Sequence, residues 1–207
     1  RLSKSFTVAS GRVQALKAVD LIIYNGELLS LVGPSGCGKT TLLNIIAGLE
    51  EPDSGEIICY QENERNSNDY RGRLMIFQEA SLFPWLSVFE NVAFGLKLRK
   101  LKRIDYRDLV MKYLDLVELR RFKDAYIHQL SGGMKQRVAL ARALVLEPEM
   151  LLMDEPFAAL DIQTRQDMYH LLLEIWQQTN KTILFITHNV DEALILSNRI
   201  LVMTPHP

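Results

Sequence analysis

Short apolar runs recur along the chain. Those at residues 28–33, 150–155 and 181–188 end in glycine or in polar residues. Strands that are covered on both faces of a parallel sheet have this continuous apolar pattern, because neither face meets water. Two further runs, at residues 56–60 and 199–203, also predict strands.

Between these runs the apolar positions follow helical spacing. Residues 40–49, 162–178 and 191–197 predict helices that separate the strands, and from about residue 85 to 146 the whole pattern is helical. In that long stretch the apolar residues at three- and four-residue spacing are Leu109, Val110, Tyr113, Leu114 and Val117. Alternating strands and helices at both ends predict an α/β fold with a parallel sheet, into which the helical stretch is inserted.

Two polar stretches interrupt this pattern. Residues 61–72 are polar and predict an exposed loop. Residues 96–103 hold five basic residues in eight and predict a solvated helix face, with proximity to an anionic membrane as the alternative.

The charge balance excludes one large class of function. The 207 residues contain 24 Lys and Arg against 25 Asp and Glu, so the formal net charge is 24 − 25 = −1. Domains that grip nucleic acid are usually markedly basic, so we expect no nucleic-acid partner. No apolar run approaches the roughly 18 residues that span a bilayer, so a role at a membrane requires a separate membrane partner.

The two cysteines and the start of the chain add little to the functional picture. Cys37 and Cys59 are expected to be free thiols in a reducing cytosol. The first residues lack the apolar core of a signal peptide. The chain begins at Arg1, as a fragment would.

A glycine-rich loop follows the first buried strand. "GPSGCGKT", Gly33 to Thr40, fits the phosphate-loop pattern G-x-x-x-x-G-K-[ST], with a predicted strand before it and a helix after it. Glycines let successive N–H groups converge on phosphate oxygens at a helix N-terminus. Lys39 is expected to neutralise phosphate charge and the Thr40 hydroxyl to bind Mg²⁺; the alternative is a mere glycine-rich turn.

Two acids close the run "MLLMDE". We expect Asp154 and Glu155 at the end of a strand that lies beside the phosphate-loop strand. A phosphate-loop enzyme needs one carboxylate for the metal, assigned to Asp154, and one to activate water, assigned to Glu155. Without the phosphate loop, two solvated acids at a strand end would explain the pair.

"LSGGMKQRVALARAL", residues 130–144, resembles the signature of ATP-binding cassette (ABC) ATPases. Further positions match family motifs in the family's order. Gln78 matches the Q-loop, Asp161 the D-loop and His188 the switch histidine, and Phe6 lies where the family places an aromatic that stacks on adenine. The resemblance covers essentially the whole chain.

The resemblance implies ATP and Mg²⁺ as cofactors and assigns residues to them. The residues implied to contact the nucleotide are Phe6, Gly33, Pro34, Ser35, Gly36, Cys37, Gly38, Lys39, Thr40, Thr41, Ser131, Gly132, Gly133 and Asp161. Those implied to hold the metal are Thr40, Gln78 and Asp154, and those implied to be catalytic are Glu155, His188, Gln78 and Lys39.

Several of these residues have a purely structural alternative. Ser131 and Asp161 each precede a predicted helix and can serve as its N-cap. His188 can be a structural histidine, and Phe6 can be a core residue.

The family's architecture carries over as an expectation. It implies a single nucleotide-binding domain over residues 1–207, with a RecA-like phosphate-loop core and an N-terminal antiparallel β subdomain at about 1–84 and 147–207. The inserted helical signature subdomain is expected at about 85–146. Two ATPase chains, identical or different, would pair head to tail, so that Ser131, Gly132 and Gly133 of one copy cover the phosphates of the other.

The resemblance also implies membrane partners. A helix of an integral membrane permease would dock near Gln78 to Val92, where the apolar residues either face a partner or pack the insert; these are Leu82, Phe83, Trp85 and Leu86. The chain would then lie peripherally on the cytoplasmic face of the inner membrane. A periplasmic or surface solute-binding protein would act on it indirectly.

Longer segments look like the ATPases of nitrate, sulfonate, taurine and related small-anion importers. Asn189 departs from the usual aspartate, but it is expected to cap its helix together with Glu192 in a capping-box-like pair. The alternatives are an exporter or lipid-extracting system, a non-transport ABC ATPase of chromosomes, repair or translation, and a phosphate-loop kinase.

Overall fold

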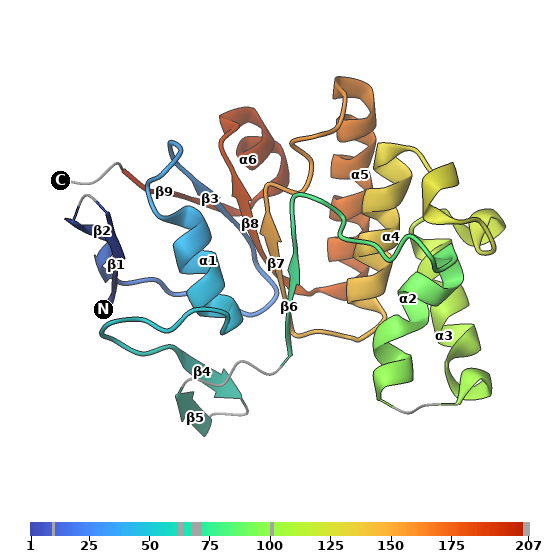
Figure 1. The fold of residues 1–207 in the computed structure, drawn as a ribbon, viewed down its shortest axis with the longest axis horizontal. Helices are drawn as coiled ribbons and strands as arrows, with labels where there is room; N and C mark the ends of the chain where they lie inside the picture. The colour runs from blue at the N-terminus through green and yellow to red at the C-terminus, as the bar shows by residue number, and fades with distance from the viewer. Residues whose placement is uncertain (10, 62–63, 68–71, 100–101, 205–207) are drawn as a thin grey trace.

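A computed structural model describes residues 1–9, 11–61, 64–67, 72–99 and 102–204. A five-stranded parallel sheet lies at its centre, with a two-stranded antiparallel hairpin at the N-terminal side and a group of helices at the other (Figure 1). The sheet order is β6–β7–β8–β3–β9. The predicted α/β class, with a parallel core, an N-terminal antiparallel β part and an inserted helical part, is confirmed.

The strands are β1 (Leu2–Val8), β2 (Gly11–Val19), β3 (Leu28–Val32), β4 (Ile58–Gln61), β5 (Glu64–Ser67), β6 (Arg73–Ile76), β7 (Met150–Asp154), β8 (Thr182–Thr187) and β9 (Arg199–Val202). The helices are α1 (Lys39–Ala47), α2 (Val88–Leu98), α3 (Arg103–Leu116), α4 (Gly132–Leu144), α5 (Ile162–Thr179) and α6 (Val190–Leu196), with 3₁₀ turns at Arg120–Phe122 and Ile127–Gln129. Within the described residues, every helix is too short or too polar to serve as a membrane span.

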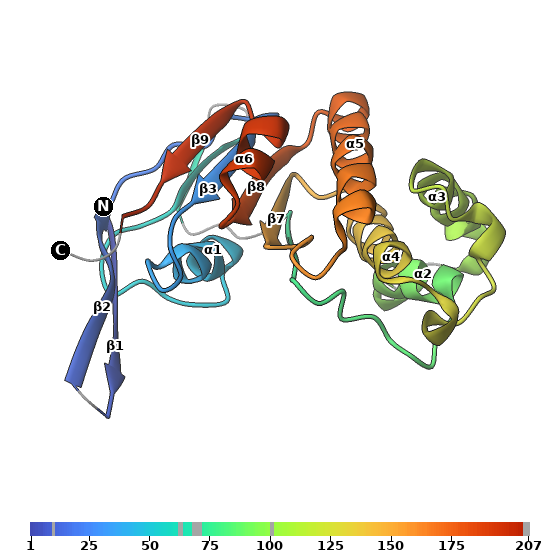
Figure 2. The same cartoon turned by 90° about the horizontal axis from the view of Figure 1, so that it is seen from above.

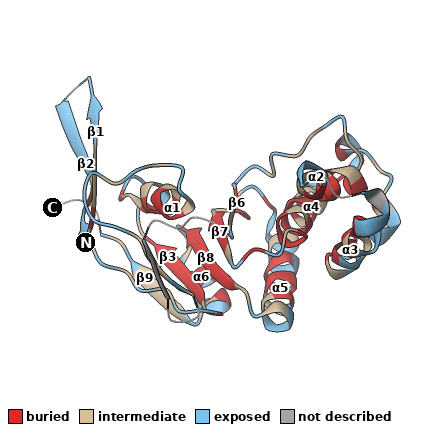
Figure 3. Cartoon of the chain, turned by 90° about the horizontal axis from the view of Figure 1, so that it is seen from below, coloured by how far each residue is buried: buried red, intermediate tan, exposed pale blue. Residues whose placement is uncertain are grey.

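The two strands at the centre of the sheet are buried along their whole length. Every residue of β3 and of β8 is buried (Figure 3). Their register pairs Val32 with Thr187, and β7 pairs Asp154 with Ile186. Because all three strands run in the same direction, their carboxyl ends meet at one edge of the sheet.

The strand of Asp154 does not lie beside the phosphate-loop strand, contrary to the expectation from the sequence. β8 lies between β7 and β3 and pairs with both of them. The backbone N–H and C=O groups of a buried strand need partners on both sides, and β7 and β3 supply them for β8. A crossover places β8 there although it comes last of the three in the chain, and chain order alone does not reveal such a crossover.

Successive side chains of the central strands enter two separate cores. Ile183 and Phe185 pack with the large helices, whereas Leu184 and Ile186 pack with α1 and the β1–β2 hairpin. Since side chains alternate between the two faces of a strand, a continuous apolar run supplies both cores at once. The side chains of β7 alternate in the same way, and its Leu152 packs in the core on the α1 side.

The inserted helices form where their spacing predicts them. Ser87 caps α2 in a reciprocal pair with Glu90, with a bond of 3.2 Å from the Glu90 N–H to the Ser87 hydroxyl. In α3 the predicted apolar positions are buried except Leu109, which is partly buried against the same core. The subdomain limits near residues 84 and 147 stay a prediction.

Both predictions for the polar stretches need correction. Residues 61–72 are not all loop, because Glu64–Ser67 forms β5 and pairs with β4; residues 62–63 and 68–71 lie outside the described part. A polar strand gives no apolar alternation by which to recognise it. The basic run 96–103 is not one helix face either, since α2 ends at Leu98 and α3 begins at Arg103, with residues 100–101 outside the description.

Phe185 tests the core on the helical side of the sheet. It is fully buried, and its ring centroid lies 5.7 Å from that of Phe157. Phe185→Ala is expected to lower the free energy of unfolding by about 3–5 kcal/mol, because it removes contacts and leaves a cavity. Urea denaturation measures this loss. Val202→Ala, at a residue 73% exposed, serves as the control and should change it by less than about 0.5 kcal/mol; equal effects would contradict the placement of the core.

Candidate nucleotide-binding site

The glycine-rich loop joins β3 to α1, and its glycines meet specific steric demands. Gly38 is the N-cap of α1 with φ 99°, and a Cβ there would lie 2.5 Å from the Ala15 carbonyl oxygen. A Cβ on Gly33 would lie 2.5 Å from the Met203 carbonyl oxygen. Because Gly38 has no side chain to cap α1, the first N–H groups of the helix remain for an anionic ligand.

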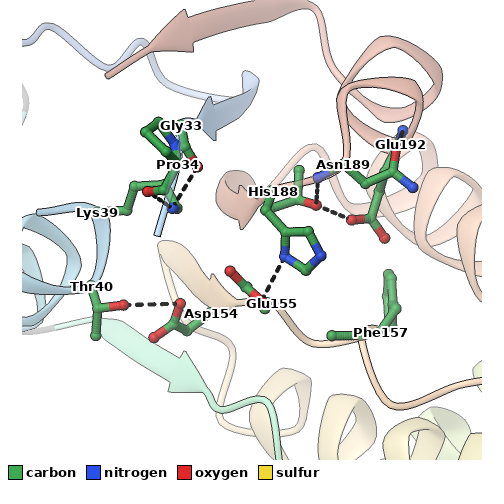
Figure 4. A network of polar contacts seen from close by, with 12 residues as sticks. Gly33, Pro34, Lys39, Thr40, Asp154, Glu155, Phe157, His188, Asn189 and Glu192 are labelled. Carbon is green, nitrogen blue, oxygen red and sulfur yellow. Dashed lines mark hydrogen bonds and ion pairs between the residues drawn. The ribbon is translucent and has the colours of Figure 1, made fainter. Parts of the chain in front are cut away.

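The Lys39 ammonium lies at the mouth of this loop. It is 2.8 Å from the Gly33 carbonyl oxygen and 2.9 Å from that of Pro34 (Figure 4). An ammonium has three N–H donors, so these two bonds orient the group and leave one donor for a phosphate oxygen. The side chain is buried by the loop that it stabilises.

Thr40 and Asp154 come together across the gap between α1 and β7. The Thr40 hydroxyl lies 3.5 Å from Asp154 Oδ1. Burial raises the pKa of the Asp154 carboxyl, the bond from Thr40 offsets part of this, and the neighbouring Glu155 charge raises it further.

These oxygens fit Mg²⁺, which prefers hard oxygen ligands. Among the described residues, no group of three or more His, Cys, Asp or Glu is placed to hold a metal ion. Mg²⁺ is commonly bound by one or two protein oxygens together with substrate phosphates, and the pair of Thr40 and Asp154 suits that mode.

Glu155 has an uncommon backbone conformation. Its φ is 44°, in the left-handed region that costs a non-glycine residue about 1 kcal/mol or more. Its N–H donates to the Ile186 carbonyl oxygen at 3.0 Å, and this bond to β8 keeps the turn in place. Oε2 of Glu155 then lies 2.9 Å from His188 Nδ1, so the predicted base and the predicted switch histidine are in contact.

A buried network holds the base of His188. The Thr187 hydroxyl donates to Glu192 and accepts the Asn189 N–H at 2.9 Å. The Asn189 side chain caps α6 as predicted, accepting from Asp191 and Glu192. The expected capping-box role of Glu192 is wrong, because its carboxylate accepts from Thr187 at the end of β8, where a polar group would otherwise be buried without a partner.

Asp161 caps α5, accepting the Thr164 N–H at 3.0 Å. Hydrogen bonds from the Thr164 side chain and from the Thr164 N–H lower the pKa of the Asp161 carboxyl. The sequence pattern did not predict a role for Arg165. Its guanidinium donates to the Phe157 carbonyl oxygen at 3.2 Å and to that of Leu160 at 2.7 Å, and so holds the turn between Glu155 and Asp161. An arginine one turn into a helix is ordinary in sequence, so nothing marked it.

The signature residues lie at the start of α4, away from the phosphate loop of the same chain. Figures 1 and 2 both show β7 between α1 and α4, and Figure 1 shows β6 there as well. Ser131 caps α4 by accepting the Met134 N–H at 3.3 Å, so the capping role is real. A Cβ on Gly133 would lie 2.4 Å from Thr164 Cγ2, which explains this glycine by close packing on α5. Ser131 and Gly132 are exposed.

Gln78 and Phe6 lie at the margins of the site. Gln78 is exposed, and its carbonyl oxygen accepts a bond of 2.8 Å from Gln136 of α4. Phe6 on β1 is 37% exposed, so it is not a core residue, and Lys4 lies 5.3 Å from its ring centroid. The hairpin that carries Phe6 reaches the phosphate loop through Ala15 and Gly38. Both cysteines are free thiols, as expected.

The fold and this arrangement of side chains define a phosphate-loop nucleotide-binding cassette. The ABC transporter family matches residues 16–158. The chain belongs to this family.

Individual relatives are similar over the whole chain. The taurine import ATP-binding protein TauB of Roseobacter denitrificans is 50% identical over 207 residues, covering all of this chain and 76% of its own. The nitrate import ATP-binding protein NrtD of Synechocystis sp. is 48% identical over 206 residues, covering 100% and 77%. A dimeric post-hydrolysis structure of the ATP-binding cassette MJ0796, bound to ADP and Pi, superposes with a TM-score of 0.81 at 33% identity, covering 100% and 94%.

Two glycines of the loop allow a matched test of its geometry. Gly36 and Gly38 both have positive φ, but a Cβ on Gly36 meets nothing within 4 Å. Gly36→Ala is expected to cost about 1 kcal/mol of stability through backbone strain alone. Gly38→Ala should cost at least about 1 kcal/mol more, because it adds a clash with the Ala15 carbonyl. Urea unfolding and binding of a fluorescent ATP analogue measure both variants; equal losses would contradict the close approach.

Proposed function

We propose that this protein is the ATP-hydrolysing subunit of an ABC importer, coupling ATP-driven dimer closure to solute uptake through a separate permease. One observation carries the proposal. The ends of β3, β7 and β8 bring the phosphate loop, the pair of Thr40 and Asp154, and the contact between Glu155 and His188 to one edge of the sheet.

Each group has a role that its position supports. The loop N–H groups and Lys39 bind the β and γ phosphates of ATP, and Phe6 stacks on adenine. Thr40 and Asp154, with Gln78 from the neighbouring loop, hold Mg²⁺, which neutralises charge on the phosphates. The remaining contacts with the nucleotide are made by loop residues Gly33 to Thr41 of one chain. The other chain contributes Ser131, Gly132, Gly133 and Asp161.

Hydrolysis needs a positioned water and a base. Glu155 uses Oε2 for His188 and has Oε1 free to orient a water and accept its proton as the oxygen attacks the γ phosphorus. The bond from phosphorus to the ADP oxygen breaks. His188 holds Glu155 through Nδ1 and presents Nε2 toward the γ phosphate.

A second cassette completes the site. Ser35, Gly36 and Thr40 are exposed, and Ser131 and Gly132 lie exposed elsewhere on the same chain. In a head-to-tail pair each exposed helix start meets the phosphates bound by the other copy. The dimeric cassette with ADP and Pi supports this arrangement.

The permease contact is proposed at the segment after Gln78. Trp85 is 70% exposed, and Leu82, Phe83 and Leu86 are partly buried, so the apolar residues face outward in part. A permease helix docking here would place the chain on the cytoplasmic face of the cell membrane, with a solute-binding protein acting through the permease.

The solute class rests on the relatives. The two relatives described above are import ATP-binding proteins for taurine and nitrate, and we propose a small anion of this kind. The permease and the binding protein select it, so the cassette itself needs no residue for it.

Lys39→Ala tests the ATPase site. The loss of the ammonium is expected to lower ATP hydrolysis by at least about 100-fold, since charge on the γ phosphate is no longer stabilised. Phosphate release by the purified protein measures this. Lys112→Ala, at an exposed lysine of α3, is the control. Hydrolysis near the wild-type rate in the Lys39 variant would overturn the site.

Glu155→Gln tests the dimer. The amide keeps the size of the side chain but does not accept a proton, so ATP remains bound between the two copies. We expect an ATP- and Mg²⁺-dependent dimer in size-exclusion chromatography, with hydrolysis reduced at least about 100-fold. Glu174→Gln, at an exposed glutamate of α5, should behave as wild type. Only monomer with ATP and Mg²⁺ would contradict the paired arrangement.

A further inference from the structure

Helix α4 makes a second set of contacts that its role over the phosphates does not explain. Gln136, which is 6% exposed, donates from Nε2 to the Gln78 carbonyl oxygen at 2.8 Å. Arg142 spreads its guanidinium over the next carbonyls, at 3.0 Å from that of Ala80 and 2.9 Å from that of Ser81. Three carbonyl oxygens of the Gln78 loop are thus bound by two side chains of the signature helix.

These contacts coincide with backbone strain at Ser81 and with desolvation of the Arg142 guanidinium, both of which are unfavourable. Ser81 has φ 44°, so the loop is held in a conformation that a serine rarely adopts. Burial lowers the pKa of the Arg142 guanidinium, although an arginine stays charged. A desolvated charge needs good hydrogen bonds in return, and the carbonyls supply them.

The contacts continue from the loop to the exposed surface. The Arg142 guanidinium lies 5.7 Å from the Phe83 ring centroid, and that ring lies 5.6 Å from the ring of Trp85. Asn91, fully buried, accepts from the Phe83 N–H at 2.9 Å and donates to the Phe83 and Leu86 carbonyl oxygens. The segment from Gln78 to Leu86 is therefore held by side chains from α4 and α2.

We propose that Gln136 and Arg142 are positioning residues, which hold the Gln78 loop to α4 so that the Gln78 side chain and the Trp85 surface move with the signature helix. Ser131 caps the start of the same helix. When α4 moves relative to the phosphates of a second copy, the Gln78 loop therefore moves with it. This inference rests on the proposed function only for the ATPase measurement in the test below.

The test uses the full chain in a Trp176→Phe background, which leaves Trp85 as the single tryptophan. Trp176 lies on α5 and bonds to the Gly26 carbonyl oxygen, away from the Gln78 loop. The variants are Gln136→Met and Arg142→Met, which keep much of the volume and remove the donors. Arg137→Met is the matched control, since Arg137 lies on α4 and donates to the Val117 carbonyl oxygen instead.

Two readouts separate positioning from general stability. Steady-state ATPase gives kcat and KM for ATP, and the time-resolved anisotropy of Trp85 gives its local motion on the nanosecond scale. In Gln136→Met and Arg142→Met we expect kcat to fall about tenfold and KM to change less than about twofold, because Gln78 is displaced while the phosphate loop is intact.

The anisotropy arm gives a second expected result. The fraction of Trp85 anisotropy lost to local motion should rise about twofold in Arg142→Met. Arg142→Lys, which keeps the charge but replaces the planar fork of N–H groups with a single ammonium, should fall between wild type and Arg142→Met in both readouts. Arg137→Met should match the background in both, although it is expected to lose some stability.

The proposal is overturned if folded Gln136→Met and Arg142→Met proteins keep the background kcat and Trp85 anisotropy, or if Arg137→Met changes both by as much. Circular dichroism and thermal unfolding check folding; if Arg142→Met does not fold, Gln136→Met and Arg142→Lys carry the test. An inactive background protein would count against the proposed function, whereas the anisotropy result would still decide the contact between α4 and the loop.

Discussion

The parallel register of β7, β8 and β3 is the constraint on which the site depends. It sets Asp154 beside Ile186 and Val32 beside Thr187, so that groups more than one hundred residues apart in the chain emerge at one sheet edge. The bond from the Glu155 N–H to the Ile186 carbonyl then holds a left-handed turn that points its carboxylate at His188. A slip of one residue in this register would turn every side chain of the shifted strand to the opposite face of the sheet and separate the pair.

Exposed helix N-termini are a second feature that recurs around the site. The N-terminus of α1 has only a glycine as its cap and keeps its N–H groups for an anion. The N-termini of α4 and α5 are capped by Ser131 and Asp161, yet both caps are exposed. A capping role and a ligand role are therefore compatible, since a serine hydroxyl that accepts one bond can still donate another.

Side chains of helices α4 and α5 hold two of the loops around the sheet. Arg165 binds carbonyl oxygens of the turn before α5, and Gln136 and Arg142 bind those of the segment after β6. Such loops can shift as units with the helix that holds them, because the bonds connect each loop to one helix. This gives a physical basis for coupled motion of α4 and the segment after β6 without unfolding either.

The sequence by itself determined the fold class, most element positions, and the places of the phosphate loop and of the two acids at the end of β7, since periodicity and short motifs are local properties. Only the tertiary structure decided that β8 separates β7 from β3, that β5 forms in a polar stretch, and that Glu192 bonds to Thr187 instead of closing a capping box. It also placed the side chains of Gln136, Arg142 and Arg165 against backbone carbonyl oxygens. Strand order and contacts with backbone carbonyls depend on residues far apart in the chain, and a local pattern carries no record of them.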